Sequence, residues 1–145
     1  RCHYTRVNQT REIPMSTRAR IGFENRDGSI TSVYHHFDGY SSWLGVKLNE
    51  HYNTRQKAKS LISGGDMSVC LDDDGNPNPM YYSQGGENCP PRTDADYHEY
   101  TNVDCGEEFH YIWTTDDEWI CIDQHQYDGT DQAPELVQIP GFEVV

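Results

Sequence analysis

The sequence EFHYIWTTDDEWICID, residues 108–123, predicts the best-defined element of structure in this chain. Its two halves are rich in aromatic and β-branched residues, and residues 115–117 supply a polar turn between them, which is the pattern of a β-hairpin. Side chains alternate between the two faces of a strand, so Phe109, Tyr111 and Trp113 should share one face.

The segments upstream predict a second hairpin and two helices. Residues 20–24 alternate in polarity, an Asn-Arg-Asp-Gly turn follows, and residues 30–37 are β-branched and aromatic. Helical spacing of apolar residues indicates helices over residues 43–52 and from Thr54, which can act as an N-cap, to residue 62. We therefore predict an α+β fold, in which an antiparallel sheet built from two hairpins carries two packed helices.

The remaining segments are less regular. We predict loop over residues 66–92, with one short strand near residues 80–82, and a helical turn within residues 94–100. The organisation expected is an extension over residues 1–14 that is either non-native or docks on a partner, one domain over residues 15–123, and a C-terminal tail over residues 124–145.

Charge is divided unevenly along the chain. Residues 1–65 hold ten Lys or Arg and five Asp or Glu, whereas residues 66–145 hold one and nineteen, for a net charge of −13. Such a surface repels nucleic acid and acidic membranes and attracts basic protein surfaces. No apolar run approaches the ~18 residues that span a bilayer, and no secretory signal pattern opens the sequence. We therefore expect a cytoplasmic protein with a protein partner.

The five cysteines are Cys2, Cys70, Cys89, Cys105 and Cys121, and no Cys-x-x-Cys pair occurs. Structural zinc sites use closely spaced cysteine pairs, so these spacings do not favour one. We predict reduced thiols, with a disulfide between Cys89 and Cys105 as the alternative.

Three interpretations remain open for the sequence around residues 35–40. One is structural, with a histidine in the core and a turn at Asp38. Another is a metal site, because His36 and Asp38 share a strand face and Glu50 or His51 could complete a histidine and carboxylate set. The last is a polar groove in which His36 and Tyr40 contact a ligand. The candidate binding residues are His36, Asp38, Tyr40, Trp43, His51, Asp116, Asp117 and Glu118.

Other catalytic and cofactor patterns are missing from the sequence. The acidic run at residues 72–78 has Pro77 where a calcium-binding EF-hand loop needs Gly and Ser83 where it needs Glu, so we interpret it as a solvated turn. There is no Gly-x-Ser-x-Gly nucleophile motif and no phosphate-binding loop. We predict no cofactor, and catalysis is not favoured.

The segments Met-Ser-Thr-Arg at residues 15–18 and Val-Tyr-His-His-Phe-Asp-Gly-Tyr at residues 33–40 are similar to a family of small bacteriophage proteins. Its members typically begin Met-x-Thr-Arg and carry Val-Tyr-x-His-(Trp/Phe)-Asp-Gly-Tyr, followed by a proline that is Ser41 here. The resemblance covers residues 15–123. The family has no established activity, so the resemblance implies an origin, a phage accessory gene expressed in a bacterial cytoplasm.

The function that we predict is therefore non-enzymatic binding of a protein partner, including mimicry of nucleic-acid charge to inhibit a host nucleic-acid enzyme. The alternatives are a virion or assembly component that self-associates through its tails, and a metal-dependent hydrolase built on His36, Asp38 and His51. The acids that would supply the mimicry are Asp94, Asp96, Glu99, Asp104, Glu107, Glu108, Asp116, Asp117 and Glu118.

Overall fold

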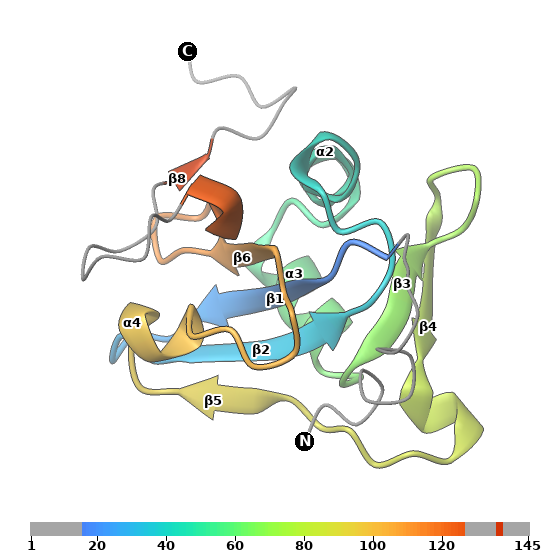
Figure 1. The fold of residues 1–145 in the computed structure, drawn as a ribbon, viewed down its shortest axis with the longest axis horizontal. Helices are drawn as coiled ribbons and strands as arrows, with labels where there is room; N and C mark the ends of the chain where they lie inside the picture. Colours follow the sequence, from blue (N-terminus) through green and yellow to red (C-terminus); the bar gives the residue numbers. More distant parts are fainter. Residues whose placement is uncertain (1–15, 127–135, 138–145) are drawn as a thin grey trace.

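In the part of the chain that the structure describes, eight strands form one mixed sheet with the order β4-β3-β2-β1-β6-β7-β8, and β5 pairs with β2 beside this path (Figure 1). The computed structural model describes residues 16–126 and 136–137 of the chain. The elements are β1 (Ala19–Glu24), β2 (Ile30–His35), η1 (Ser41–Gly45), α2 (Val46–His51), α3 (Arg55–Ile62), β3 (Met67–Leu71), β4 (Pro77–Tyr81), η2 (Tyr82–Gly85), β5 (Arg92–Asp94), α4 (Tyr97–Tyr100), β6 (Phe109–Trp113), β7 (Trp119–Asp123), η3 (Gln124–Gln126) and β8 (Leu136–Val137).

The α+β class is confirmed, but the prediction of a purely antiparallel sheet is wrong. β1 pairs antiparallel with β2, and β6 pairs antiparallel with β7. The two pairs are joined by β1 and β6, which run parallel from Ala19 opposite Phe109 to Phe23 opposite Trp113. β1 therefore lies in the interior of the sheet, and its residues Ala19 and Ile21 are fully buried.

The prediction of loop over residues 66–92 is wrong in extent, because this segment contains β3 and the start of β5 as well as β4, which overlaps the one strand predicted near residues 80–82. β4 has prolines at positions 77 and 79, which cannot donate backbone hydrogen bonds, and it forms an edge of the sheet. The acidic turn closes the β3–β4 pair, because the Asp72 carboxylate accepts hydrogen bonds from the amides of Asp74 and Asn76, both at 2.9 Å. A segment dense in proline and turn residues thus still forms strands.

The expected helices lie close to their predicted positions. η1 and α2 form one continuous helical segment, whose first turn is a π-helix. Thr54 caps α3 by accepting a hydrogen bond from the Lys57 amide at 3.1 Å, and α4 follows within the segment predicted to hold a helical turn. Within the described residues, no helix has the length and apolar character that crossing a membrane requires.

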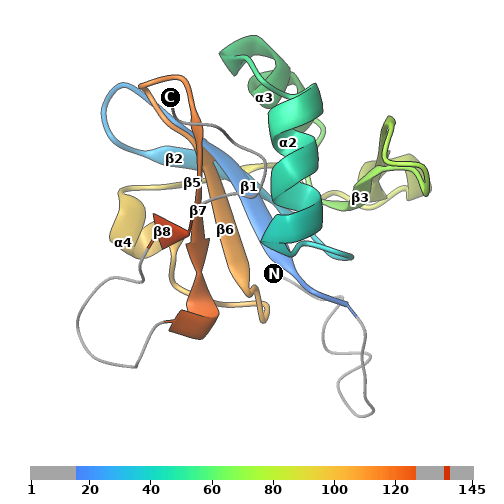
Figure 2. The ribbon, with the colours of Figure 1, turned by 90° about the horizontal axis from the view of Figure 1, so that it is seen from above.

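The sheet separates two layers. α2 and α3 cover one face, and α4 lies on the other (Figure 2). The aromatic faces of β6 and β7 pack with β1 against α2 and α3 to form the main hydrophobic core, which confirms that Phe109, Tyr111 and Trp113 share a face. A smaller cluster on the opposite face contains Ile30, Tyr100, Ile112 and Ile122.

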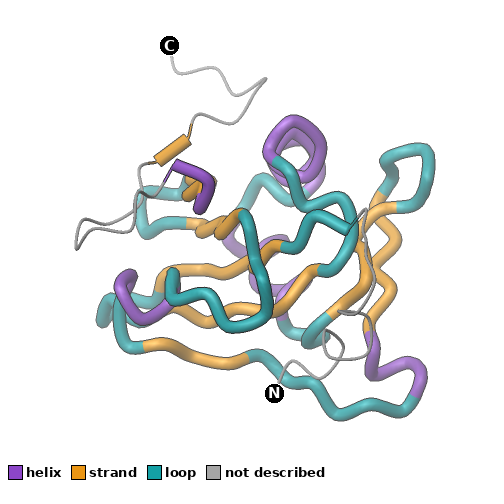
Figure 3. The backbone as a smooth tube through the Cα atoms, in the orientation of Figure 1, coloured by secondary structure: helices purple, strands orange, loops and turns teal. Residues whose placement is uncertain are grey.

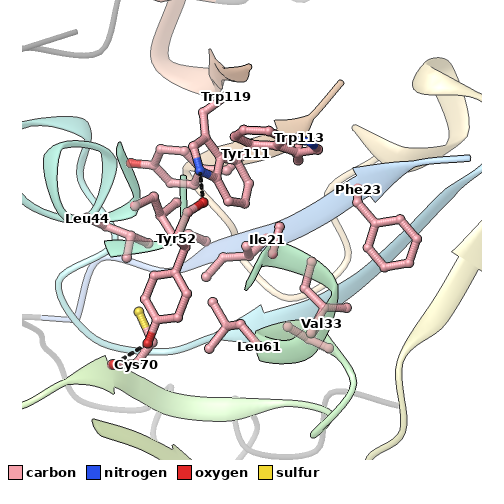
Figure 4. Packing of buried hydrophobic residues seen from close by; sticks show 14 of the residues in the cluster. Ile21, Phe23, Val33, Leu44, Tyr52, Leu61, Cys70, Tyr111, Trp113 and Trp119 are labelled. Atoms are coloured by element: carbon pink, nitrogen blue, oxygen red, sulfur yellow. Dashed lines mark hydrogen bonds between the residues drawn. The ribbon is translucent and has the colours of Figure 1, made fainter. Parts of the chain in front are cut away.

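Tyr52 joins the helical layer to both halves of the sheet (Figure 4). Its carbonyl accepts a hydrogen bond from the Trp119 indole N–H at 2.8 Å, and its hydroxyl donates to the Cys70 carbonyl at 3.3 Å. The residue that ends the α2 segment therefore contacts β7 on one side and β3 on the other.

A buried ion pair lies on the face opposite the main core. The loop between α4 and β6 passes over β1 and β2 (Figure 3) and places Glu107 against Arg20, with 3.8 Å between the guanidinium and a carboxylate oxygen. Arg20 also donates to the Ser32 hydroxyl at 2.9 Å, and the other Glu107 oxygen accepts from the amides of Asp104 and Cys105. Burial lowers the pKa of Arg20 and raises that of Glu107, so each charge depends on the other.

The prediction of reduced thiols is wrong for Cys105. Cys70, Cys89 and Cys121 carry thiols, which excludes the alternative Cys89–Cys105 bond. Cys105 is disulfide-bonded. Pairing depends on the spatial distance between two cysteines, which sequence spacing does not show.

Replacing Glu107 with alanine should destabilise the protein by about 3–5 kcal/mol, because Arg20 would remain buried without its carboxylate partner. The free energy of unfolding from urea titration measures the loss. Glu108→Ala is the matched control, since Glu108 lies next in sequence but pairs with the exposed His125 and should cost less than about 1 kcal/mol. Equal losses for the two variants would contradict the role assigned to the buried pair.

Candidate functional site

A tight turn after β2 begins the candidate site. Asp38 has φ of +57°, a left-handed conformation that Asp and Asn adopt more readily than most residues. At Gly39 a Cβ atom would lie 2.7 Å from the Ala19 Cβ, and the Gly39 amide donates to the Thr17 carbonyl at 2.8 Å. The Asp-Gly pair therefore lets the chain leave the sheet close to β1 and begin η1 after Tyr40.

A pocket of about 150 Å³ opens between this turn, η1 and β3. Three aspartates are among its lining residues, and no Lys or Arg of the described part of the chain is. Its lining residues are His35, Phe37, Asp38, Trp43, Val69, Cys70, Leu71, Asp72 and Asp73. The pocket is thus acidic at its polar groups and aromatic or aliphatic elsewhere, which suits a cationic ligand.

Exposed apolar side chains gather at the same end of the sheet. Of the four large hydrophobic side chains that are exposed in the described part of the chain, three are Phe37, Tyr40 and Met80, at 45%, 39% and 48% exposure. Phe37 lines the pocket, Tyr40 immediately precedes η1, and Met80 lies opposite the lining residue Val69 in the β3–β4 register. Exposed apolar residues concentrated around a pocket indicate a contact surface.

The buried end of the pocket does not have the chemistry of a nucleophilic site. The Cys70 amide donates to Nε2 of His35 at 3.2 Å, and both residues are almost fully buried. Burial lowers the pKa of His35 to about 3 and raises that of the Cys70 thiol to about 12. At neutral pH the imidazole and the thiol are therefore both uncharged, whereas a cysteine nucleophile needs a thiolate.

Sequence reasoning predicted part of this site. Asp38 and Trp43 line the pocket, and Tyr40 precedes η1 at its edge. His36 does not line it, because its Nδ1 is hydrogen-bonded to the Tyr34 hydroxyl at 2.6 Å. His51 lies on α2, where its Nε2 is 3.6 Å from the Glu50 carboxylate.

The predicted metal group of His36, Asp38 and His51 is not assembled. Among the described residues, the group of three or more potential ligands within 4.8 Å of one another is Asp104, Cys105 and Glu107. The prediction assumed a strand through residue 37, but β2 ends at His35 and Asp38 lies in the turn, so alternation along a strand no longer applies.

The Asp104, Cys105 and Glu107 group is poorly suited to a metal ion. Cys105 is disulfide-bonded and offers no thiolate. Asp104 accepts a hydrogen bond from Arg92 at 2.7 Å, and Glu107 pairs with Arg20. Two guanidinium groups therefore already neutralise these carboxylates.

The other predicted binding residues form a turn at the opposite end of the sheet. Asp116 and Asp117 are exposed and Glu118 is half-buried. The Thr115 amide donates to the Glu24 carboxylate at 3.0 Å, which places this turn beside the end of β1, whereas the pocket lies beside its beginning. The predicted binding residues thus belong to two separate surfaces.

Several acids expected to supply a mimic of phosphate charge have partners within the protein. Asp94 and Asp104 both bind Arg92, at 3.0 and 2.7 Å. Asp96 caps α4 by accepting from the Glu99 amide. With Glu107 buried and Glu108 paired to His125, these acids do not form a row of unpaired charges.

Sequence reasoning did not identify His35, Cys70, Asp72 or Asp73 as pocket residues. The missing signal was the β3–β4 pair, which carries Cys70 and the acidic turn to the end of β2. The prolines in the β4 sequence argue against a strand, so this strand pair was not predicted. His35 and His36 were both visible, but the end of β2 decides which of them lines the pocket.

Comparisons with protein-family models, curated proteins and solved structures find no match to this chain. The function is therefore argued from the geometry of the site.

Cys70 and Cys121 should resist alkylation in the folded protein, because both thiols are buried and burial raises the pKa of each to about 12. Iodoacetamide treatment at pH 7.5 followed by peptide mass spectrometry measures this. Both cysteines should become modified once the protein is unfolded in urea, which provides the control. Rapid modification of Cys70 in the folded protein would indicate a reactive thiol and contradict a non-catalytic pocket.

Proposed function

We propose that this chain is a non-enzymatic bacteriophage accessory protein that binds a protein partner with a basic surface. The observation that supports this most is the composition of the pocket, in which Asp38, Asp72 and Asp73 lie with aromatic and aliphatic residues and no Lys or Arg of the described residues is part of the lining. The phage origin rests on the sequence resemblance described above.

The charge of the protein favours the same type of partner. A net charge of −13 attracts a basic surface over a long distance, and three carboxylates at the pocket would orient it. Phe37, Tyr40 and Met80 supply apolar area that a contact could bury. Electrostatics would then speed association, and the apolar contacts would slow dissociation.

An enzymatic role has less support. General acid–base or nucleophilic catalysis needs a group that can change protonation near neutral pH, whereas burial keeps His35 neutral and Cys70 protonated. The hydrolase alternative depended on His36, Asp38 and His51, which are not assembled.

Two other predictions concern different parts of the chain. Self-association through the tails involves residues that lie outside the described ranges. Inhibition of a host nucleic-acid enzyme remains compatible with the proposal, because such enzymes present the basic grooves that an acidic protein fits.

Asp38→Asn should weaken partner binding, whereas Asp117→Asn should not. The two residues form a matched pair, because both are exposed aspartates with left-handed φ values, of 57° and 62°, at opposite ends of the sheet. Each substitution removes one negative charge and keeps a residue that tolerates this conformation. Losing a charge-assisted hydrogen bond should cost at least about tenfold in affinity.

The experiment is affinity capture from a bacterial lysate with the tagged wild-type protein and both variants, at low and high salt. A protein retained by the wild type and Asp117→Asn, and lost with Asp38→Asn or at high salt, would support the proposal. Capture that is equal for all three proteins would contradict a role for the pocket.

A further inference from the structure

Cys105 takes part in a disulfide bond, and the other cysteines restrict which residue supplies the second sulfur. The chain contains five cysteines, and Cys70, Cys89 and Cys121 carry free thiols. Within one chain, the cysteine that remains is Cys2. The partner of Cys105 therefore follows by elimination from the composition of the chain and the state of its other cysteines.

The beginning of the described chain lies next to Cys105. The Arg18 guanidinium donates a hydrogen bond to the Cys105 carbonyl at 3.2 Å, and the Arg18 carbonyl accepts one from the Glu108 amide at 2.7 Å. Cys2 precedes Arg18 by 16 residues, and a segment of that length can extend over about 50 Å. A disulfide needs the two Cα atoms within about 7 Å of each other, which this length of chain allows.

Cys105 belongs to the loop that covers the buried ion pair. Its side chain is almost fully buried, and its amide donates to a Glu107 carboxylate oxygen at 3.0 Å. The same oxygen accepts from the Asp104 amide at 3.1 Å, and the Glu107 carboxylate pairs with Arg20. The Asp104 carboxylate in turn accepts from Arg92. A bond to the Cys105 sulfur is therefore attached directly to the backbone that positions Glu107.

We infer that Cys2 and Cys105 form this disulfide bond, which attaches the amino-terminal segment covalently to the loop over the Arg20–Glu107 pair. The bond encloses residues 2–105 in one covalent loop, so it restricts the unfolded chain strongly. The attachment is reversible by reduction, which places it under the control of redox conditions. This inference is independent of the proposed binding function.

The chemistry of the bond is thiol–disulfide exchange. With oxidised glutathione as the oxidant, the two cysteine thiols form one S–S bond, and two molecules of reduced glutathione leave with the two electrons and two protons. A dithiol reductant reverses the step and ends as its own disulfide. Cys70 and Cys121 do not compete, because both are buried and burial raises the pKa of each thiol to about 12.

The first test maps the disulfide in the full chain after equilibration with oxidised glutathione. Free thiols are blocked with N-ethylmaleimide in urea, and the unreduced protein is digested with trypsin and Glu-C for mass spectrometry. Cleavage after Glu108 separates Cys105 from Cys121. We expect a peptide with Cys2 linked to a peptide with Cys105, and its loss after reduction. A blocked Cys2 thiol, or Cys105 joined to any other group or to a second chain, would overturn the inference.

The second test measures whether the bond holds the loop in place. In Cys2→Ser, amide hydrogen exchange at Asp104 and Cys105 should become at least about tenfold faster, because these amides bind the Glu107 carboxylate within the attached loop. Cys89→Ser is the matched control, since it removes a thiol that is not in the bond and should leave both rates unchanged. Unchanged exchange in β6 and β7 shows that each variant is folded.

Equal exchange at Asp104 and Cys105 in the wild type and in Cys2→Ser would overturn the effect of the bond on the loop. Reduction of the wild-type protein provides a second measurement, because it should accelerate the same two amides without any substitution. Neither test involves a partner protein, so a failure here leaves the proposed function to be judged by the capture experiment.

Discussion

The parallel pairing of β1 with β6 is the contact on which the rest of the structure depends. It joins the hairpin of β1 and β2 to the hairpin of β6 and β7, which lie about 90 residues apart in the chain. Because β1 then has a neighbour on each side, its apolar residues become interior. The same pairing sets Phe23 beside Trp113, which extends the apolar surface that α2 and α3 cover. Tyr52 completes this arrangement by bonding both β7 and β3.

Strand direction also separates the two acidic surfaces. β1 and β6 run parallel, so the turn that follows β6 lies beside the end of β1, and the turn that follows the antiparallel β2 lies beside its beginning. The acidic residues 116–118 and the pocket therefore occupy opposite ends of the sheet. Of these two surfaces, only the pocket combines its carboxylates with aromatic lining. For this reason we assign recognition to that end.

Most buried polar groups in the described residues serve the fold. Arg20 and Glu107 pair beneath the loop that precedes β6, and Arg92 binds two of the nearby aspartates. His36 is hydrogen-bonded to Tyr34. These contacts pair Glu107, Asp94 and Asp104 within the molecule, so these three acids are not available to a partner. His35 differs, because one nitrogen holds the Cys70 amide and the other has no partner while its ring lines a pocket.

The sequence by itself determined the elements whose signals are local. Alternation along residues 108–123 and the Thr54 cap depend on neighbours within a few residues, so both could be predicted. Asp38, Tyr40 and Trp43 were predicted for the same reason, since a turn leading into a helix is a short-range pattern. The tertiary structure alone decided the mixed sheet, the disulfide state of Cys105 and the choice of His35 for the pocket. Each of these depends on which distant segments meet in space rather than on any local preference.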